Sequence, residues 1–235
     1  QKMLQGAFGD ATKIANGLVV WAPLSLVSGA LIVTFKADLW NLGVEGQIMV
    51  GAIFTTWILR VFEPSTLNPQ VCIILACFGG VFGGMLWAAL TGVLRLYGGV
   101  SEIFAGVGLN FVATALSLWL IFGPWKRPGV GSMSGTVPFK EEFWLSMIPG
   151  YRLSVWSLVL VVLVFAFLAI LLSRTRFGIN VKAIGKNPEA ARLLGIRTKR
   201  TMMSAMLLCG GIAGLAGAIQ VVGVYHRLIP SISSG

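Results

Sequence analysis

Long stretches without a charged residue constrain the fold of this chain more than any other feature. No residue between Lys13 and Lys36 is charged, and the segment Leu153–Ser173 is long, largely aliphatic and uncharged. A helix of about 20 apolar residues crosses the hydrocarbon core of a bilayer. Only helices and closed barrels pair all of their backbone polar groups in lipid, and runs of this length indicate helices. The sequence therefore predicts an all-α, polytopic transmembrane helical bundle.

Composition favours a membrane protein over a soluble one. The chain is 56% hydrophobic and 11% charged, whereas soluble domains carry about 25% charged residues. The net charge of +10 raises the question of nucleic acid. However, the cations gather at the ends of apolar runs, which is typical of membrane topology, so we expect no nucleic-acid partner. Cys72, Cys77 and Cys209 lie in apolar stretches and are interpreted as small core residues, not as a disulfide framework or a metal site.

The apolar runs predict six membrane helices, and a break precedes the second. Asp38–Gln47 is polar and contains glycine, which predicts a broken or re-entrant segment before a helix that ends near Leu59. Ser101 is expected to cap the helix that follows it. The other expected spans are Ile14–Phe35, Gln70–Leu94, Ser101 to about Phe122, Leu153–Ser173 and Thr201–Val224.

We expect residues 1–235 to form one transmembrane domain that is a piece of a longer protein, with spans missing at the C-terminus and also at the N-terminus. An internal repeat is also indicated. Leu31–Gln47 and Ile219–Gly235 share one order: an apolar helix end, a basic residue, and a polar break with glycine or proline. Paired interrupted segments are typical of the inverted repeats of transporters.

The segment Arg174–Arg200 carries eight cations and one acid, and it lies between two apolar runs. Basic segments beside membrane spans stay in the cytoplasm. The segment is therefore predicted to be cytoplasmic, with Lys36 and Arg95 at the same face. Residues 60–69 and 123–152 are then expected on the outer face.

The centre of this basic segment has the order of a short docking helix. Asn187-Pro188 favours a helix start, and Glu189 sits where a helix N-terminus prefers an acid. Ala190 and Ala191, with the leucines that follow, supply an apolar face, and Gly195 suits a helix end. The simpler interpretation is a charge cluster that only sets topology.

The string Asn41-Leu-Gly-Val-Glu-Gly-Gln47 is the first candidate for a functional site. Glu45 must lie close to the bilayer, where an ionised carboxylate is costly unless it faces water or a partner. The glycines suit an unwound backbone whose N–H groups bind polar groups of a substrate. Alternatively, the string is an interfacial loop in which Asn41 caps the next helix and Glu45 favours the helix dipole.

Two further sets of polar residues fall near membrane spans. One helix face carries a polar stripe of five residues, which are Glu102, Gly106, Asn110, Thr114 and Ser117. This stripe could line a substrate path or form hydrogen bonds between helices, and Asn110 is the better functional candidate because a buried carboxamide needs several partners. The pair His226-Arg227 is interpreted as an interfacial anchor in preference to a proton relay.

These motifs together resemble a known family. Glu189-Ala190-Ala191-x-x-x-Gly195 resembles the EAA-x-x-x-G coupling motif of ABC importer permeases, and Gly178–Arg192 is similar to the branched-chain amino acid, simple-sugar and nucleoside group. Asn41–Gln47, and the segments Gly99–Ile103 and Leu109-Asn110, resemble the simple-sugar and nucleoside branch. Ser101 and Phe111 depart from the residues common there.

The resemblance implies the permease subunit of a bacterial ABC importer in the cytoplasmic (inner) membrane, carrying a nucleoside or a simple sugar. It implies a cytoplasmic ATPase, a second permease subunit that is identical or related, and an external binding protein or lipoprotein. The chain has no Gly-x-x-x-x-Gly-Lys-Ser/Thr loop, so we expect no ATPase activity of its own and no bound cofactor, the ATP being used by the partner. The residues implied to border the path are Asn41, Glu45, Gln47 and Asn110, and those implied to couple to the ATPase are Asn187, Pro188, Glu189, Ala190, Ala191 and Gly195.

Two other classes of function stay open at this point. An ion-coupled secondary carrier would need paired titratable groups inside the membrane, and the candidates are Glu45, Glu102 and His226. A structural membrane protein is the other alternative, and the polar breaks argue against it.

Overall fold

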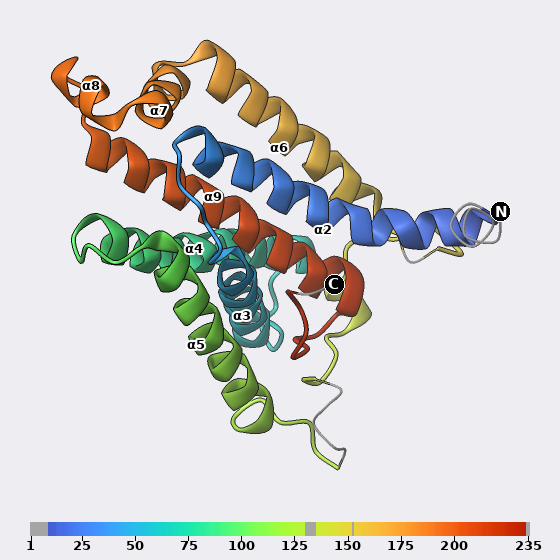
Figure 1. Ribbon diagram of the computed structural model, residues 1–235. Coiled ribbons are helices and arrows are strands. Elements are labelled where there is room, and N and C mark those ends of the chain that lie inside the picture. The colour runs from blue at the N-terminus through green and yellow to red at the C-terminus, as the bar shows by residue number, and fades with distance from the viewer. Residues whose placement is uncertain (1–8, 130–134, 152, 234–235) are drawn as a thin grey trace.

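The computed structural model describes residues 9–129, 135–151 and 153–233. Within these residues the chain is helical without a β-strand, and six helices are long and apolar enough to cross a membrane (Figure 1). The six are α2 (Ala11–Lys36), α3 (Val44–Phe62), α4 (Pro69–Leu96), α5 (Glu102–Phe122), α6 (Val155–Arg174) and α9 (Thr198–Gln220), the last continued by a π-helical turn, η3 (Val221–Tyr225). Two short helices, α7 (Arg176–Lys186) and α8 (Pro188–Leu193), and a 3₁₀ turn, η2 (Glu141–Phe143), complete the set. The predicted all-α polytopic bundle is confirmed.

Two details at helix boundaries differ from the sequence-based expectation. Helix α3 extends to Phe62, so Arg60 lies in the helix and not in the loop expected over residues 60–69. Ser101 occupies the N-cap position of α5, but its side chain makes no capping hydrogen bond. The first turn of α5 is instead tied to the end of α4, because the Glu102 carboxylate lies 2.7 Å from Arg95 Nε.

Helix α9 lies at the centre of the bundle, between α2 and the pair α3 and α4 (Figure 1). Glycines bring these backbones together: a methyl group added to Gly214 of α9 would overlap the Gly80 carbonyl oxygen and lie 3.0 Å from Gly84 Cα. Gly51 of α3 meets Gly214 from the other side. Small residues allow such close helix packing in lipid.

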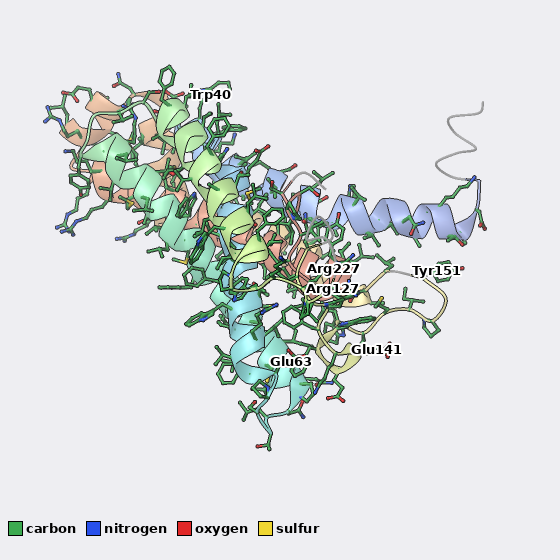
Figure 2. All side chains as sticks on the ribbon, turned by 90° about the horizontal axis from the view of Figure 1, so that it is seen from below. Trp40, Glu63, Arg127, Glu141, Tyr151 and Arg227 are labelled. Atoms are coloured by element: carbon green, nitrogen blue, oxygen red, sulfur yellow. The ribbon has the colours of Figure 1, made fainter. Side chains whose placement is uncertain are left out.

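The loops sort to two ends of the bundle as predicted. At one end Lys199 Nζ lies 5.1 Å from the Tyr97 ring, which joins the α4–α5 turn to the start of α9. At the other end the Arg60 guanidinium lies 5.2 Å from the Trp125 ring, which joins the α3–α4 and α5–α6 connections. Figure 2 agrees, since Trp40 lies at one end whereas Glu63, Arg127, Glu141 and Arg227 lie toward the other.

The basic segment is more ordered than a loop. It begins with α7, which was not predicted, and Thr175 caps this helix by accepting a hydrogen bond from Gly178 N at 3.3 Å. Helix α7 buries Gly178, Val181 and Ile184, a three-residue spacing that places one face against the bundle. The expected second helix is present as α8.

The two breaks of the expected repeat share one backbone feature. When Leu31 is aligned with Ile219, Asp38 pairs with His226. These are the two non-glycine residues with positive φ in the described part of the chain, at 57° and 55°. Helices α2 and α9 pack together in opposite directions, so the breaks that follow them lie at opposite ends of the bundle (Figure 1). This arrangement agrees with an inverted repeat.

A segment between α5 and α6 covers the second break. Phe139 N donates to His226 O at 2.9 Å, Thr136 N donates to Leu228 O at 2.9 Å, and Leu145 N donates to Val222 O at 3.0 Å. The Trp144 ring stacks on the His226 ring with centroids 3.9 Å apart. His226 is therefore packed at one end of the bundle, as expected of an anchor.

Candidate functional site

The first break is held by a reciprocal pair of buried amides. Asn41 Nδ2 donates to Gln47 Oε1, and Gln47 Nε2 donates to Asn41 Oδ1, both at 3.1 Å. Asn41 Nδ2 also lies 3.1 Å from the Cys209 sulfur of α9. All three side chains are buried. The interpretation of Asn41 as the cap of α3 is therefore wrong: Gly43 holds the cap position, and the Asn41 amide is used by Gln47 and Cys209 instead.

The start of α3 is capped from another helix. Asn110 of α5 accepts a hydrogen bond from Gly46 N at 2.8 Å and donates one to Leu42 O at 2.8 Å. The first N–H groups of a helix have no partner within the helix, so Asn110 supplies from α5 what a local cap residue would supply. Gly43 and Gly106 lie in backbone contact here, which lets α5 come close enough for this bond.

Trp87 of α4 packs against the first turn of α3, at Gly46. A Cβ on Gly46 would lie 2.7 Å from Trp87 Nε1 and 2.9 Å from Asn110 Oδ1. The indole is buried, and within the described residues its N–H has no hydrogen-bond partner. Gly46 is therefore required at this position, because any side chain would displace one of these two groups.

Glu45 differs from the other residues of its string. It lies in the first turn of α3 and is exposed, whereas Asn41 and Gln47 are buried and Asn110 is half-buried. Cys209, which contacts Asn41, is about 17 Å along α9 from Thr198 at 1.5 Å per residue. The Asn41 contact therefore lies away from the start of α9, and Glu45 presents an exposed carboxylate in the first turn of a helix that is long and apolar enough to cross a membrane.

The polar stripe of α5 lies mostly against α3 and the turn before α5. Gly106 touches Gly43, and the Thr114 hydroxyl lies 3.5 Å from the Met49 sulfur while donating to Asn110 O. Ser117 is buried. Hydrogen bonding accounts for Thr114, whereas the buried Ser117 hydroxyl has no hydrogen-bond partner among the described residues. A role for Asn110 in a substrate path stays a prediction.

Helix α8 has the predicted residues at its two ends. The Asn187 side chain accepts hydrogen bonds from Glu189 N and Ala190 N, both at 3.0 Å, and Pro188 is the first residue of α8. Gly195 follows the helix with a φ of 82°, where glycine is favoured. Ala191 is buried against the bundle, whereas Leu193 and Leu194, which follow it, are 82% and 80% exposed. Leu193 is the last residue of α8 and Leu194 its C-cap, so the exposed pair lies at the end of this short helix.

Three features of these sites escaped sequence reasoning. Cys209 was interpreted only as a small core residue, Trp87 was not singled out, and α7 was read as part of a loop. The partners of the first two come from distant parts of the chain, so local spacing gave no signal for them. For α7, the three-residue spacing of its buried residues was a usable signal.

Replacing Asn110 with leucine should destabilise the start of α3 without removing apolar volume. Loss of a helix cap and of a hydrogen bond costs about 1–2 kcal/mol. We expect a thermal unfolding midpoint lower by roughly 3–6 °C for a chain of this size, measured in detergent micelles. Asn110→Asp, which keeps the acceptor for Gly46 N, should lose less. Equal midpoints for the leucine variant and the unmodified protein would contradict the assigned cap.

Comparison with known proteins gives a family. The model of the branched-chain amino acid transport system / permease component family matches residues 13–234. The nucleoside ABC transporter permease protein NupB of Lactococcus lactis subsp. cremoris is 26% identical over 97% of this chain and 64% of that protein. A glucose ABC transporter permease of Haloferax volcanii is 31% identical over 93% of this chain and 59% of that protein. A guanosine ABC transporter permease of Bacillus subtilis is 24% identical over 94% of this chain and 63% of that protein.

The chain thus spans about three fifths of the length of these curated relatives. No solved structure matches it. The family match covers all six long helices apart from the first two residues of α2, and it includes the break before α3 and α8. The chain is a multi-pass membrane protein that belongs to the branched-chain amino acid transport system / permease component family.

Proposed function

We propose that this protein is the permease subunit of an ABC importer that carries a nucleoside or a simple sugar across a bacterial cytoplasmic membrane. The observation that carries the proposal is α8, a capped helix that presents Leu193 and Leu194 to solvent at the cationic end of the bundle. Such a helix fits a groove on a cytoplasmic ATPase. Relatives named as nucleoside, guanosine and glucose permeases support the substrate class.

The partners follow from what the chain contains. The sequence contains no phosphate-binding loop for ATP, and we propose that a separate ATPase subunit supplies the energy. The exposed Glu45 carboxylate, in the first turn of a helix that can cross a membrane, cannot face lipid at low cost. We propose that a second permease subunit covers this face and that a water-filled path runs between the two. An external binding protein or lipoprotein delivers the substrate.

The path is proposed to be lined by few charges. Glu45 would accept hydrogen bonds from the hydroxyl groups of a sugar or ribose, and the α3 start would offer backbone N–H groups beside it. Asn110 borders this point from α5. Asn41 and Gln47, which are buried, support the path by holding the break.

An ion-coupled carrier is less well supported by the geometry. Among the described residues, Glu102 is paired with Arg95, and His226 is stacked on Trp144 near the opposite end of the bundle. Neither of these two candidate groups is thereby available to form a titratable pair with Glu45. A proton relay through paired groups is not what this arrangement favours.

Uptake measurements in cells that express the complete transporter test the proposal. Uptake of labelled nucleosides, pentoses and hexoses should stop when ATP is depleted while the membrane potential is maintained. It should persist when ionophores collapse the ion gradients and ATP is kept high. The reverse pattern would overturn the importer assignment in favour of a secondary carrier.

A further inference from the structure

We propose that Cys209, Asn41 and Gln47 form a joint through which movement of α9 sets the position of the α3 start. The proposal rests on the function proposed above, because it assigns these residues a positioning role in transport. None of them is required to touch the substrate. Their contacts, burial and place between α8 and Glu45 carry the argument.

The first step runs from the docking helix to α9. Only a short connection separates α8 from α9, and it is hydrogen-bonded throughout: Gly195 N donates to Arg192 O, Ile196 N to Ala191 O and Thr198 N to Ile196 O. Ala191 is also buried against the bundle. A displacement of α8 is therefore transmitted to the start of α9, and a continuous helix carries it to Cys209.

The second step is the contact between α9 and the break. At two other points α9 meets α3 through glycine backbone packing, because Gly217 packs on the Ile48 carbonyl and Gly214 packs on Gly51. Within residues 9–129, 135–151 and 153–233, Asn41 to Cys209 is the one side-chain hydrogen bond between α9 and α3 or the segment before it. It is directional, and it is shielded from water because both side chains are buried.

The third step leads to the exposed carboxylate. The two reciprocal bonds between Asn41 and Gln47 fasten the break to the first turn of α3, so the two must move together. Glu45 lies two residues before Gln47 in that turn. Asn110 restrains the same turn from α5. A shift of α9 at Cys209 thus tilts the α3 start against Asn110 and changes where Glu45 is presented.

The test compares two buried cysteines in the complete transporter with its ATPase. Cys209→Ala removes the acceptor for Asn41, whereas Cys72→Ala removes a thiol that is equally buried but packs in the apolar cluster around α4. We expect Cys209→Ala to lower the solute taken up per ATP hydrolysed by about fivefold or more, the scale of coupling between sites in proteins. Assembly and basal ATP hydrolysis should stay unchanged. Cys72→Ala should match the unmodified protein, and Cys209→Ser should restore part of the loss.

A second readout does not depend on transport. In a Cys72→Ala, Cys77→Ala background, Cys209 is the one thiol left among residues 1–235. The rate at which a membrane-permeant maleimide labels it reports how accessible the Cys209 side chain is. Asn41→Ala should raise this rate, and trapping the ATPase in its ATP-bound state should change it. A rate unaffected by nucleotide, or equal behaviour of Cys209→Ala and Cys72→Ala, would overturn the joint. A parent transporter without ATP-dependent uptake would instead overturn the proposed function, while the effect of Asn41→Ala on labelling still tests the contact.

Discussion

Replacing Gly214 with alanine is expected to destabilise the packing of the central helices. The added methyl group would overlap the Gly80 carbonyl oxygen of α4 and approach Gly84 Cα, and Gly51 of α3 blocks movement toward the other side. Backbone atoms cannot rotate away, so the helices would have to separate along most of their contact. Overpacking at such a site costs about 3 kcal/mol or more. The thermal unfolding midpoint should fall by roughly 5–10 °C, and less protein should elute as a single species in size-exclusion chromatography.

The matched control is Gly108→Ala. Gly108 lies in α5, and a Cβ there would meet no atom within 4 Å. Both substitutions change hydropathy and helix propensity equally, so any difference between them reports the contact of α9 with α3 and α4. A Gly214→Ala variant as stable as Gly108→Ala would mean that α9 is not packed at the centre of the bundle as described.

The features that follow from local pattern could be predicted from the sequence. Spans are set by the length of uncharged runs, and α8 is set by Asn187, Pro188 and Gly195, which are all within nine residues of one another. The first break was visible from its glycines and polar residues. Even the parallel between the two breaks followed from their shared order of residue types, and Asp38 and His226 now give it a backbone counterpart.

The features that depend on distant pairing could not be predicted. One of the two interpretations gave Asn41 a local capping role because helix caps are usually local, but its sulfur partner is 168 residues away. The cap of α3 comes from Asn110, which is 64 residues from Gly46. A buried amide takes whichever partner the fold brings to it, and only the packing of α5 and α9 around the break decides which one that is.

Replacing both Leu193 and Leu194 with aspartate is expected to abolish ATP-driven uptake by releasing the ATPase. The pair is exposed in this subunit, so the change leaves the bundle intact and acts only on what docks there. Burying a leucine side chain contributes about 1.5–3 kcal/mol. Losing two should weaken association at least about 100-fold. Co-purification of the ATPase with the permease and uptake in the same cells measure both effects.

Leu67→Asp provides the control, because Leu67 is also exposed but lies between α3 and α4, at the end of the bundle away from α8. It should leave ATPase association unchanged. Glu189→Lys tests the stability of α8 and leaves the exposed leucines in place. It breaks the 2.8 Å contact of Glu189 with Arg192 and places a cation at the N-terminus of α8, which the helix dipole disfavours. Deleting 186–195 removes the whole element, and the protein should still insert into the membrane. If the ATPase still co-purifies with the aspartate variant and with the deletion, α8 is not the element through which ATP hydrolysis reaches the membrane helices.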